Sequence, residues 1–294
     1  MRPRSLAPYF LQAALLLLAL VPIYPGVFLR GELLVPASYL YDFAPWSYHK
    51  PEDLPRQNPL GFEVSFAVSV WYRLTDDAFS RGEWPLWNPL QFMGAPLLAN
   101  FQTAVFYPPR LLFRLVNDTD IAMTLYILLR FWLCGFNAFI CARLLHLKTP
   151  FANLFSFAYM LAGYNLLWTF YPPPDVMAWL PLLFAATESM LNSRYRLGIA
   201  LLTIGLTMSI LAGHPSSVMM GCLGLGMYVA ARLLVSRGPF TRTLRLFSAA
   251  AAAIALSLAI CAVQLLPFFE YMPQMELFIY RMDPEGVSRY KYSI

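Results

Sequence analysis

The chain has 294 residues, of which 59% are hydrophobic and only 13% are charged, and its mean hydropathy is +0.55. This composition excludes an ordinary soluble domain, in which apolar and charged residues are more evenly balanced. The net charge of +5 comes from basic residues beside apolar segments, so it indicates membrane anchoring and not nucleic-acid binding.

Seven apolar segments follow one another along the chain, most of them near the roughly 20 residues that cross the hydrocarbon core of a bilayer. They predict an all-α polytopic membrane protein with a single membrane domain over residues 1–294. The first can also be read as a signal peptide cleaved near Val35-Pro36-Ala37, but its length and its two internal prolines favour an uncleaved anchor. The predicted spans are residues 8–29, 119–146, 150–169, 175–191, 197–211, 216–235 and 244–267.

Charged residues predict the orientation of the spans. If the N-terminus is cytoplasmic, the basic residues that flank the spans fall on the cytoplasmic side, as the positive-inside rule requires. Of the 16 acidic residues, only Glu188 falls near that side. The basic residues on it are Arg2, Arg4, Arg143, Lys148, Arg194, Arg196, Arg232, Arg237, Arg242 and Arg245.

The cysteines give no sign of a bonded or metal-bound set. Cys134, Cys141, Cys222 and Cys261 all fall inside predicted spans. This placement argues against disulfides and against a metal site built from them.

The first extracytoplasmic loop, residues 30–109, is long and contains no apolar run of spanning length. Within it, residues 63–81 have helical spacing, with Ser69 and Arg73 on one face and apolar residues such as Val68 on the other. This pattern predicts an amphipathic helix. Such a helix either lies in the membrane interface or packs against the spans.

Two acids of this loop are candidates for chemistry. Asp42 stands among aromatic residues and a proline, where a carboxylate needs a reason to be, although an Asx turn would also explain it. Glu63 begins the amphipathic helix, where a favourable interaction with the helix N-terminus competes with a catalytic role.

The segment Pro85–Pro109 is rich in proline, aromatic residues and side-chain amides. Because proline fixes φ and removes a donor, this segment is expected to follow a rigid path. Interfacial aromatic residues beside amides predict a shaped surface at the membrane boundary for a ligand with polar and apolar ends. Its candidate substrate-binding residues are Trp87, Asn88, Asn100, Gln102 and Tyr107.

Four polar residues lie in or beside the spans. Arg130 lies within span two, where a buried charge binds a phosphate or pairs with another side chain. His214 lies at the turn before span six, where it either caps a helix or donates to a phosphate or sugar. Asp175 is expected to be an ordinary N-cap, and Glu270, after span seven, is a further substrate-binding candidate.

A set of short motifs resembles the YfhO-like bacterial membrane proteins, from about residue 30 onward. The Trp-Asn-Pro block is the most specific of them. The motifs are Arg81-Gly-Glu-Trp-Pro-Leu-Trp-Asn-Pro, Met93-Gly-Ala-Pro, Ala99-Asn-Phe-Gln, Phe106-Tyr-Pro, Gly213-His-Pro and Leu266-Pro-Phe-Phe-Glu270.

The resemblance implies a GT-C glycosyltransferase of the bacterial inner (plasma) membrane. Such an enzyme takes a sugar from a polyprenyl-phosphate donor and transfers it to an extracytoplasmic acceptor: an envelope polymer, a lipid or a protein. Glu63 or Asp42 would then be the general base, and Arg130 and His214 would bind the donor phosphate. A divalent metal is compatible with this chemistry, but no residue spacing demands one.

The sequence departs from the family pattern at three of these positions. Glu63 stands where an aspartate is usual, Arg130 replaces a frequent histidine, and Pro-Ser follows His214 in place of Pro-Gln. Residues 268–294 are predicted to be an extracytoplasmic C-terminal segment. Family members usually continue well beyond this point, so the chain is expected to be a truncated gene product, a fragment or a short divergent member. Two other functions therefore stay open: a non-catalytic scaffold or inactive fragment, and a transporter or flippase.

Overall fold

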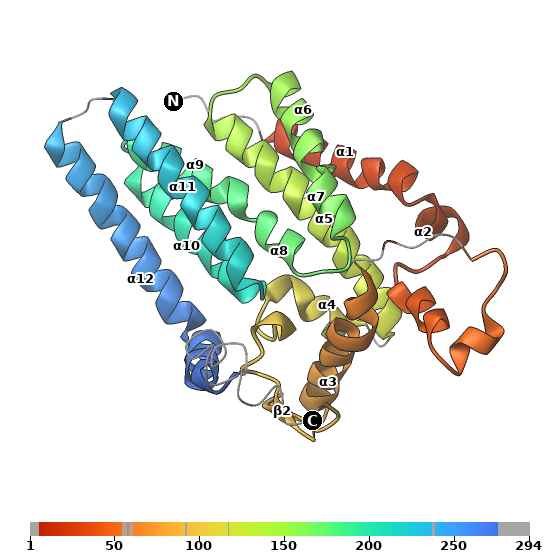
Figure 1. Cartoon of the computed structure of the whole chain (residues 1–294). Coiled ribbons are helices and arrows are strands. Elements are labelled where there is room, and N and C mark those ends of the chain that lie inside the picture. Colours follow the sequence, from red (N-terminus) through yellow and green to blue (C-terminus); the bar gives the residue numbers. More distant parts are fainter. Residues whose placement is uncertain are drawn as a thin grey trace, which may run out of the picture.

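The structure is a computed structural model that describes residues 6–54, 58, 61–91, 93–116, 118–236 and 239–275. This part of the chain is mostly helical, as the sequence predicts (Figure 1). The β structure described in it is one antiparallel pair of two-residue strands, β1 (Trp87–Asn88) and β2 (Ala95–Pro96). The predicted C-terminal segment lies outside the described residues from residue 276 onward.

Helix α5 (Thr119–Leu144) is the centre of the N-terminal half of the fold. Its N-terminus is capped by Asp118, whose carboxylate accepts hydrogen bonds from the backbone N–H groups of Asp120 and Ile121. Three helices pack against it: α1 (Ala7–Ile23), α6 (Thr149–Met160) and α9 (Leu180–Leu191).

The predicted spans three and four are each divided into two short helices. Span three consists of α6 and α7 (Gly163–Leu167), and span four of α8 (Pro173–Met177) and α9. Pro181, in the first turn of α9, explains the division of span four, because proline is tolerated at the start of a helix but breaks its interior.

Side-chain amides satisfy carbonyl groups that these interruptions release. The amide of Asn137 on α5 donates to the carbonyl of Ala178, between α8 and α9, at 2.9 Å. The amide of Asn165 on α7 donates to the carbonyl of Tyr159, at the end of α6, at 2.8 Å. Irregular backbone is tolerated at membrane depth only when it is satisfied in this way.

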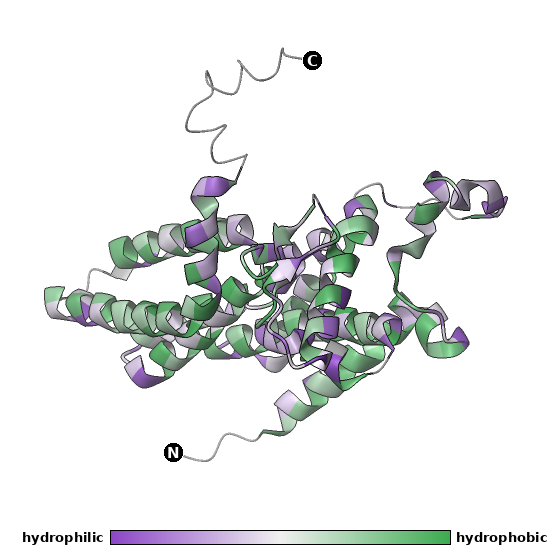
Figure 2. Ribbon diagram, turned by 90° about the horizontal axis from the view of Figure 1, so that it is seen from below, coloured by the Kyte–Doolittle hydropathy of each residue, from purple (hydrophilic) through white to green (hydrophobic). Residues whose placement is uncertain are grey.

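The C-terminal half consists of α10 (Tyr195–Leu211), α11 (Pro215–Ser236) and α12 (Phe240–Tyr271). α10 packs between α9 and α12. Figure 2 shows hydrophobic residues along most of this helical body. Three helical segments of the described chain are long and apolar enough to cross a membrane: Thr119–Leu144, Pro215–Val235 and Phe240–Gln274. α1 and α10 are apolar but shorter.

The helix predicted over residues 63–81 begins as the π-helical turn η4 (Val64–Val68) and continues as α3 (Ser69–Ser80). Val64, Val68 and Tyr72 are buried in the same hydrophobic core as α5. Of the two arrangements expected for this helix, the structure therefore has the one in which it packs against other helices. The remaining short elements are α2 (Pro25–Arg30), η1 (Pro36–Asp42), η2 (Trp46–His49), η5 (Phe101–Thr103), η6 (Pro108–Leu111), α4 (Leu112–Leu115) and η7 (Met272–Gln274).

Candidate functional site

The carboxylate of Glu63 is bound by Tyr171. Glu63 is exposed and directly precedes η4, while Tyr171 lies in the loop between α7 and α8. The Tyr171 hydroxyl donates to Oε2 of Glu63 at 3.2 Å. Burial and the negative charge of Glu63 raise the pKa of Tyr171 to about 12. The phenol therefore stays protonated and orients a carboxylate that is open to a ligand.

Arg130 holds the same loop from inside the protein. Its Nη1 donates to the carbonyl of Tyr171 at 3.1 Å, and its Nη2 donates to the carbonyl of Thr169. Nη1 also lies 3.6 Å from Oδ2 of Asp175, and both charged side chains are almost completely buried. Buried charges are stable only when they are paired and hydrogen-bonded. We call Glu63, Tyr171, Arg130 and Asp175 the Glu63 site.

Both terminal nitrogens of Arg130 thus have protein acceptors. In this arrangement the guanidinium positions the Thr169–Tyr171 backbone, and contact with a phosphate would require it to exchange an acceptor. The phosphate-binding role of Arg130 stays a prediction.

A second contact joins the segment before η4 to the end of α7, beside the Glu63 site. The side-chain amide of Asn58 donates to the carbonyl of Leu167, the last residue of α7, at 2.7 Å. The hydroxyl of Tyr39 in turn donates to the carbonyl of Asn58. Segments about 110 residues apart in the sequence are therefore joined at two points just before η4.

Asp42, the other candidate base, pairs with a different residue. It ends η1, and its carboxylate forms an ion pair with Lys50 at 2.8 Å, with both side chains about half exposed. Within the described ranges, no hydrogen bond or ion pair joins Asp42 to a member of the Glu63 site. An exposed pair of this kind contributes little to stability and orients no further group.

The segment Pro85–Pro109 uses several predicted ligand-binding residues for its own structure. Asn88 is buried and donates to Gln91 at 2.9 Å, and Asn100 caps η5 by accepting from the N–H of Gln102 at 3.2 Å. Tyr107 is buried, and its hydroxyl accepts from the indole of Trp179 at 2.8 Å. Their ligand-binding role stays a prediction.

Two residues of the same segment remain open to a ligand. Trp87 is 56% exposed, and Gln102 is partly exposed. The ring of Trp87 covers Gly94, where φ is +118° and an added Cβ would lie 2.5 Å from the ring. Only glycine fits this turn, which gives a structural reason for the Met93-Gly-Ala-Pro motif.

His214 lies at the turn before α11 and rests on the same segment. At Gly213, φ is +88° and an added Cβ would lie 2.8 Å from the carbonyl of Phe101 and 3.3 Å from Cα of Gln102. Nδ1 of His214 accepts from the backbone N–H of Ser217 at 3.2 Å, so the side chain caps α11. Burial lowers the pKa of His214. The neutral ring therefore carries its proton on Nε2, as a hydrogen-bond donor.

Glu270 faces the Pro85–Pro109 segment from the end of α12. It lines an open pocket of about 370 Å³ together with Leu98 and Ala99 of that segment. Gln264, one and a half turns earlier in α12, is buried and donates to the carbonyl of Leu98 at 2.7 Å. The C-terminal part of α12 is thereby held against the loop.

The predicted site residues therefore form two groups. Glu63 and Arg130 meet through Tyr171, whereas His214, Gln102 and Glu270 adjoin the Pro85–Pro109 segment. Figure 1 shows α3 and the C-terminal end of α12 on opposite sides of that segment. In the described part of the chain, no group of three or more His, Cys, Asp or Glu side chains is arranged to hold a metal ion.

Sequence reasoning missed three of the residues that organise these sites. Asp175 is the buried partner of Arg130; it lies inside α8, whose N-cap residue is Pro172, so the prediction of an ordinary N-cap is wrong. Tyr171 carried no signal beyond its place before three prolines. Arg110 is buried, with its Cζ 4.2 Å from the centroid of the Tyr72 ring and its Nη2 3.7 Å from Oδ1 of Asp76. In the sequence, the one indication of this role was an arginine directly after two prolines at the end of a loop.

Comparisons with protein-family models, with curated proteins and with solved structures find no match to this chain.

Proposed function

We propose that this protein is a GT-C-type membrane glycosyltransferase that moves a sugar from a polyprenyl-phosphate donor to an extracytoplasmic acceptor. In this proposal the seven spans are α1, α5, α6–α7, α8–α9, α10, α11 and α12, in a bacterial plasma membrane with the N-terminus cytoplasmic. The loop between α1 and α5 is then extracytoplasmic and carries the reacting carboxylate.

The observation that carries the proposal is the Glu63 site. An exposed carboxylate is oriented by a protonated tyrosine, and the tyrosine loop is fixed by a buried Arg130–Asp175 pair. A reacting group needs such supporting contacts from neighbouring residues to keep a productive geometry. Glu63 is favoured over Asp42 because the Asp42 carboxylate is already paired with Lys50, and no described residue orients it as Tyr171 orients Glu63.

The proposed reaction is a single displacement. Glu63 accepts the proton of the acceptor hydroxyl while that oxygen attacks the anomeric carbon. The bond between that carbon and the donor phosphate breaks, and its electron pair stays on the phosphate oxygen. A hydrogen-bond donor such as Nε2–H of His214 stabilises the negative charge on the leaving phosphate, and the anomeric configuration is inverted.

The main alternative is a non-catalytic scaffold, which is favoured because no described hydrogen bond or ion pair joins Asp42, Glu63 and His214 to one another. A transporter or flippase is the next, because two interrupted spans, α6–α7 and α8–α9, meet at Arg130 and Asp175. A scaffold predicts no turnover with any donor. A transporter predicts movement of a labelled lipid or solute without formation of a glycosylated product.

The test is transfer of a labelled sugar from a panel of polyprenyl-phosphate sugars by the purified protein in lipid. We expect Glu63→Gln to lower the turnover by about 10²- to 10⁴-fold, the range for loss of a general base. Tyr171→Phe should lower it by about tenfold, through loss of one hydrogen bond to a charged group. Asp42→Asn is the matched control and should retain the wild-type rate. Equal loss in Glu63→Gln and Asp42→Asn, or turnover that survives Glu63→Gln, would contradict the assignment.

A further inference from the structure

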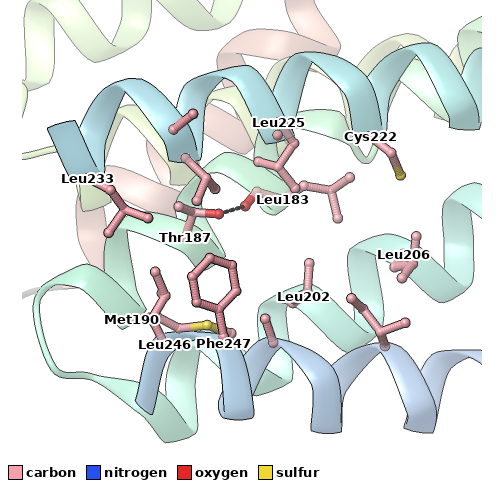
Figure 3. Close-up of a pocket in the computed structure, with 15 residues that line it drawn as sticks. Leu183, Thr187, Met190, Leu202, Leu206, Cys222, Leu225, Leu233, Leu246 and Phe247 are labelled. Atoms are coloured by element: carbon pink, nitrogen blue, oxygen red, sulfur yellow. Dashed lines mark hydrogen bonds between the residues drawn. The ribbon is translucent and has the colours of Figure 1, made fainter. Parts of the chain in front are cut away.

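An apolar groove runs between α11 and α12 over the surface of α9 and α10 (Figure 3). Its volume is about 430 Å³, within the range of about 300–1,000 Å³ for sites of small ligands. Figure 3 shows side chains of all four helices around it, with Leu225 and Leu233 on α11 opposite Leu246 and Phe247 on α12.

The lining of the groove offers no free polar group to a ligand. The Thr187 hydroxyl already donates to the carbonyl of Leu183 at 3.1 Å (Figure 3). The groove stays open because α11 presents small residues to it: at Gly226, an added Cβ would meet no atom within 4 Å. An apolar chain would fit this surface, and a polar ligand would not.

One end of the groove is basic. Arg242 lies one helical turn before Leu246 on α12, and its guanidinium donates to the carbonyl of Leu191, next to the lining residue Met190. Arg245, directly before Leu246, is exposed. Glu188 is the single acid of α9, α10 and α11, and it is already paired with Arg232 at 2.5 Å. The positive charge at this end is therefore not balanced by protein acids on these helices.

We propose that the groove binds an anionic glycerophospholipid, with an acyl chain between α11 and α12 and the phosphate headgroup beside Arg242 and Arg245. Charge complementarity selects this occupant, because a zwitterionic lipid gains less from two arginines at the interface and a second apolar helix gains nothing from them. This site lies at the opposite end of α12 from Glu270 and does not depend on the proposed glycosyl transfer.

The test uses the purified full chain, stripped of co-purified lipid in detergent, and native mass spectrometry. Phosphatidylglycerol and phosphatidylcholine with identical acyl chains are added in equal amounts. We expect the wild type to retain phosphatidylglycerol preferentially. Arg245→Gln should lower that preference by about fivefold, the contribution of one arginine at a membrane surface. Lys148→Gln is the matched control, since Lys148 is an exposed base directly before α6, a helix that does not line the groove.

A second pair of variants tests the groove itself. Gly226→Leu places a side chain in the groove, whereas Gly224→Leu places the same side chain in open space outside its lining. We expect the first to reduce retention of both lipids and the second to leave retention unchanged, with equal elution volumes in size-exclusion chromatography. Equal retention of the two lipids by the wild type would overturn the proposal. So would equal effects of the two glycine variants, or a dimer that Gly226→Leu dissociates.

Discussion

Helices α5 and α11 are both long and apolar enough to cross a membrane, yet the protein uses them in opposite ways. In an apolar 18-residue segment of α5, 61% is buried inside the protein, whereas in the corresponding segment of α11 only 6% is buried. α5 carries Arg130 and Asn137, whereas the exposed residues of α11 include Met219, Met220 and Met227. Hydrophobicity predicts that a helix can span a membrane, and its polar residues predict that it lies inside the bundle.

The polar residues of α5 also explain why the interrupted helices pack against it. Arg130 binds the carbonyls of the loop between α7 and α8, and Asn137 binds the carbonyl between α8 and α9. α11 is uninterrupted, and its described side-chain bonds to α9, from Tyr228 and Arg232, go to the Glu188 carboxylate and not to a released backbone carbonyl. The comparison therefore associates the Glu63 site with α5 and an exposed apolar surface with α11.

The largest effect expected from this comparison is that of Arg130→Ala. The substitution leaves Asp175 buried without its partner, and we expect the free energy of unfolding to fall by about 3–5 kcal/mol. Thermal unfolding in detergent measures the change. Arg232→Ala is the control on α11, because Arg232 is 39% exposed, and its effect should be smaller. An Arg130→Ala protein as stable as the wild type would show that α5 is not a polar core.

A smaller effect is expected from a matched pair of glycine substitutions. At Gly198 on α10, an added Cβ would lie 2.9 Å from the carbonyl oxygen of Ala186 on α9. We expect Gly198→Ala to destabilise the protein by about 1–3 kcal/mol, the range for overpacking. At Gly224 on α11 no atom lies within 4 Å, so Gly224→Ala should be neutral or stabilising by up to about 1 kcal/mol. Thermal unfolding measures both effects. Equal changes in the unfolding temperature of the two variants would contradict the comparison.

The smallest effect concerns pH and the start of α11. Burial lowers the pKa of His214 in the folded protein, so the unfolded chain takes up the proton first as the pH falls. The stability that neutral His214 contributes is complete above its ordinary pKa of about 6.5 and is lost as the pH falls below that value. His214→Asn keeps a capping side chain without the titration. We expect the unfolding temperature of the wild type to fall more than that of His214→Asn between pH 8 and pH 5. Parallel curves would exclude this role.

The helical class, the bounds of α5 and the helix over residues 63–81 could be predicted because they depend on local composition and periodicity. The interruption at residues 161–162 could not, since Gly163 also occurs inside ordinary helical patterns. Pro181, within predicted span four, was an available signal for the interruption at residues 178–179. Arg130 and Asp175 are 45 positions apart in the sequence, and Glu63 and Tyr171 are 108 positions apart. No local pattern encodes such contacts.

The most direct test of the account is the side of the membrane on which the Glu63 loop lies. Cysteine is placed at exposed positions by Asp77→Cys on α3 or Arg194→Cys before α10, in a chain whose Cys134, Cys141, Cys222 and Cys261 have been replaced. Intact cells are then treated with a membrane-impermeant maleimide. We predict that Asp77→Cys is labelled at once and that Arg194→Cys is labelled only after permeabilisation. The reverse pattern would place the Glu63 loop on the wrong side for the proposed reaction and contradict the account. Labelling of both in intact cells would contradict the proposed path of the spans between Asp77 and Arg194.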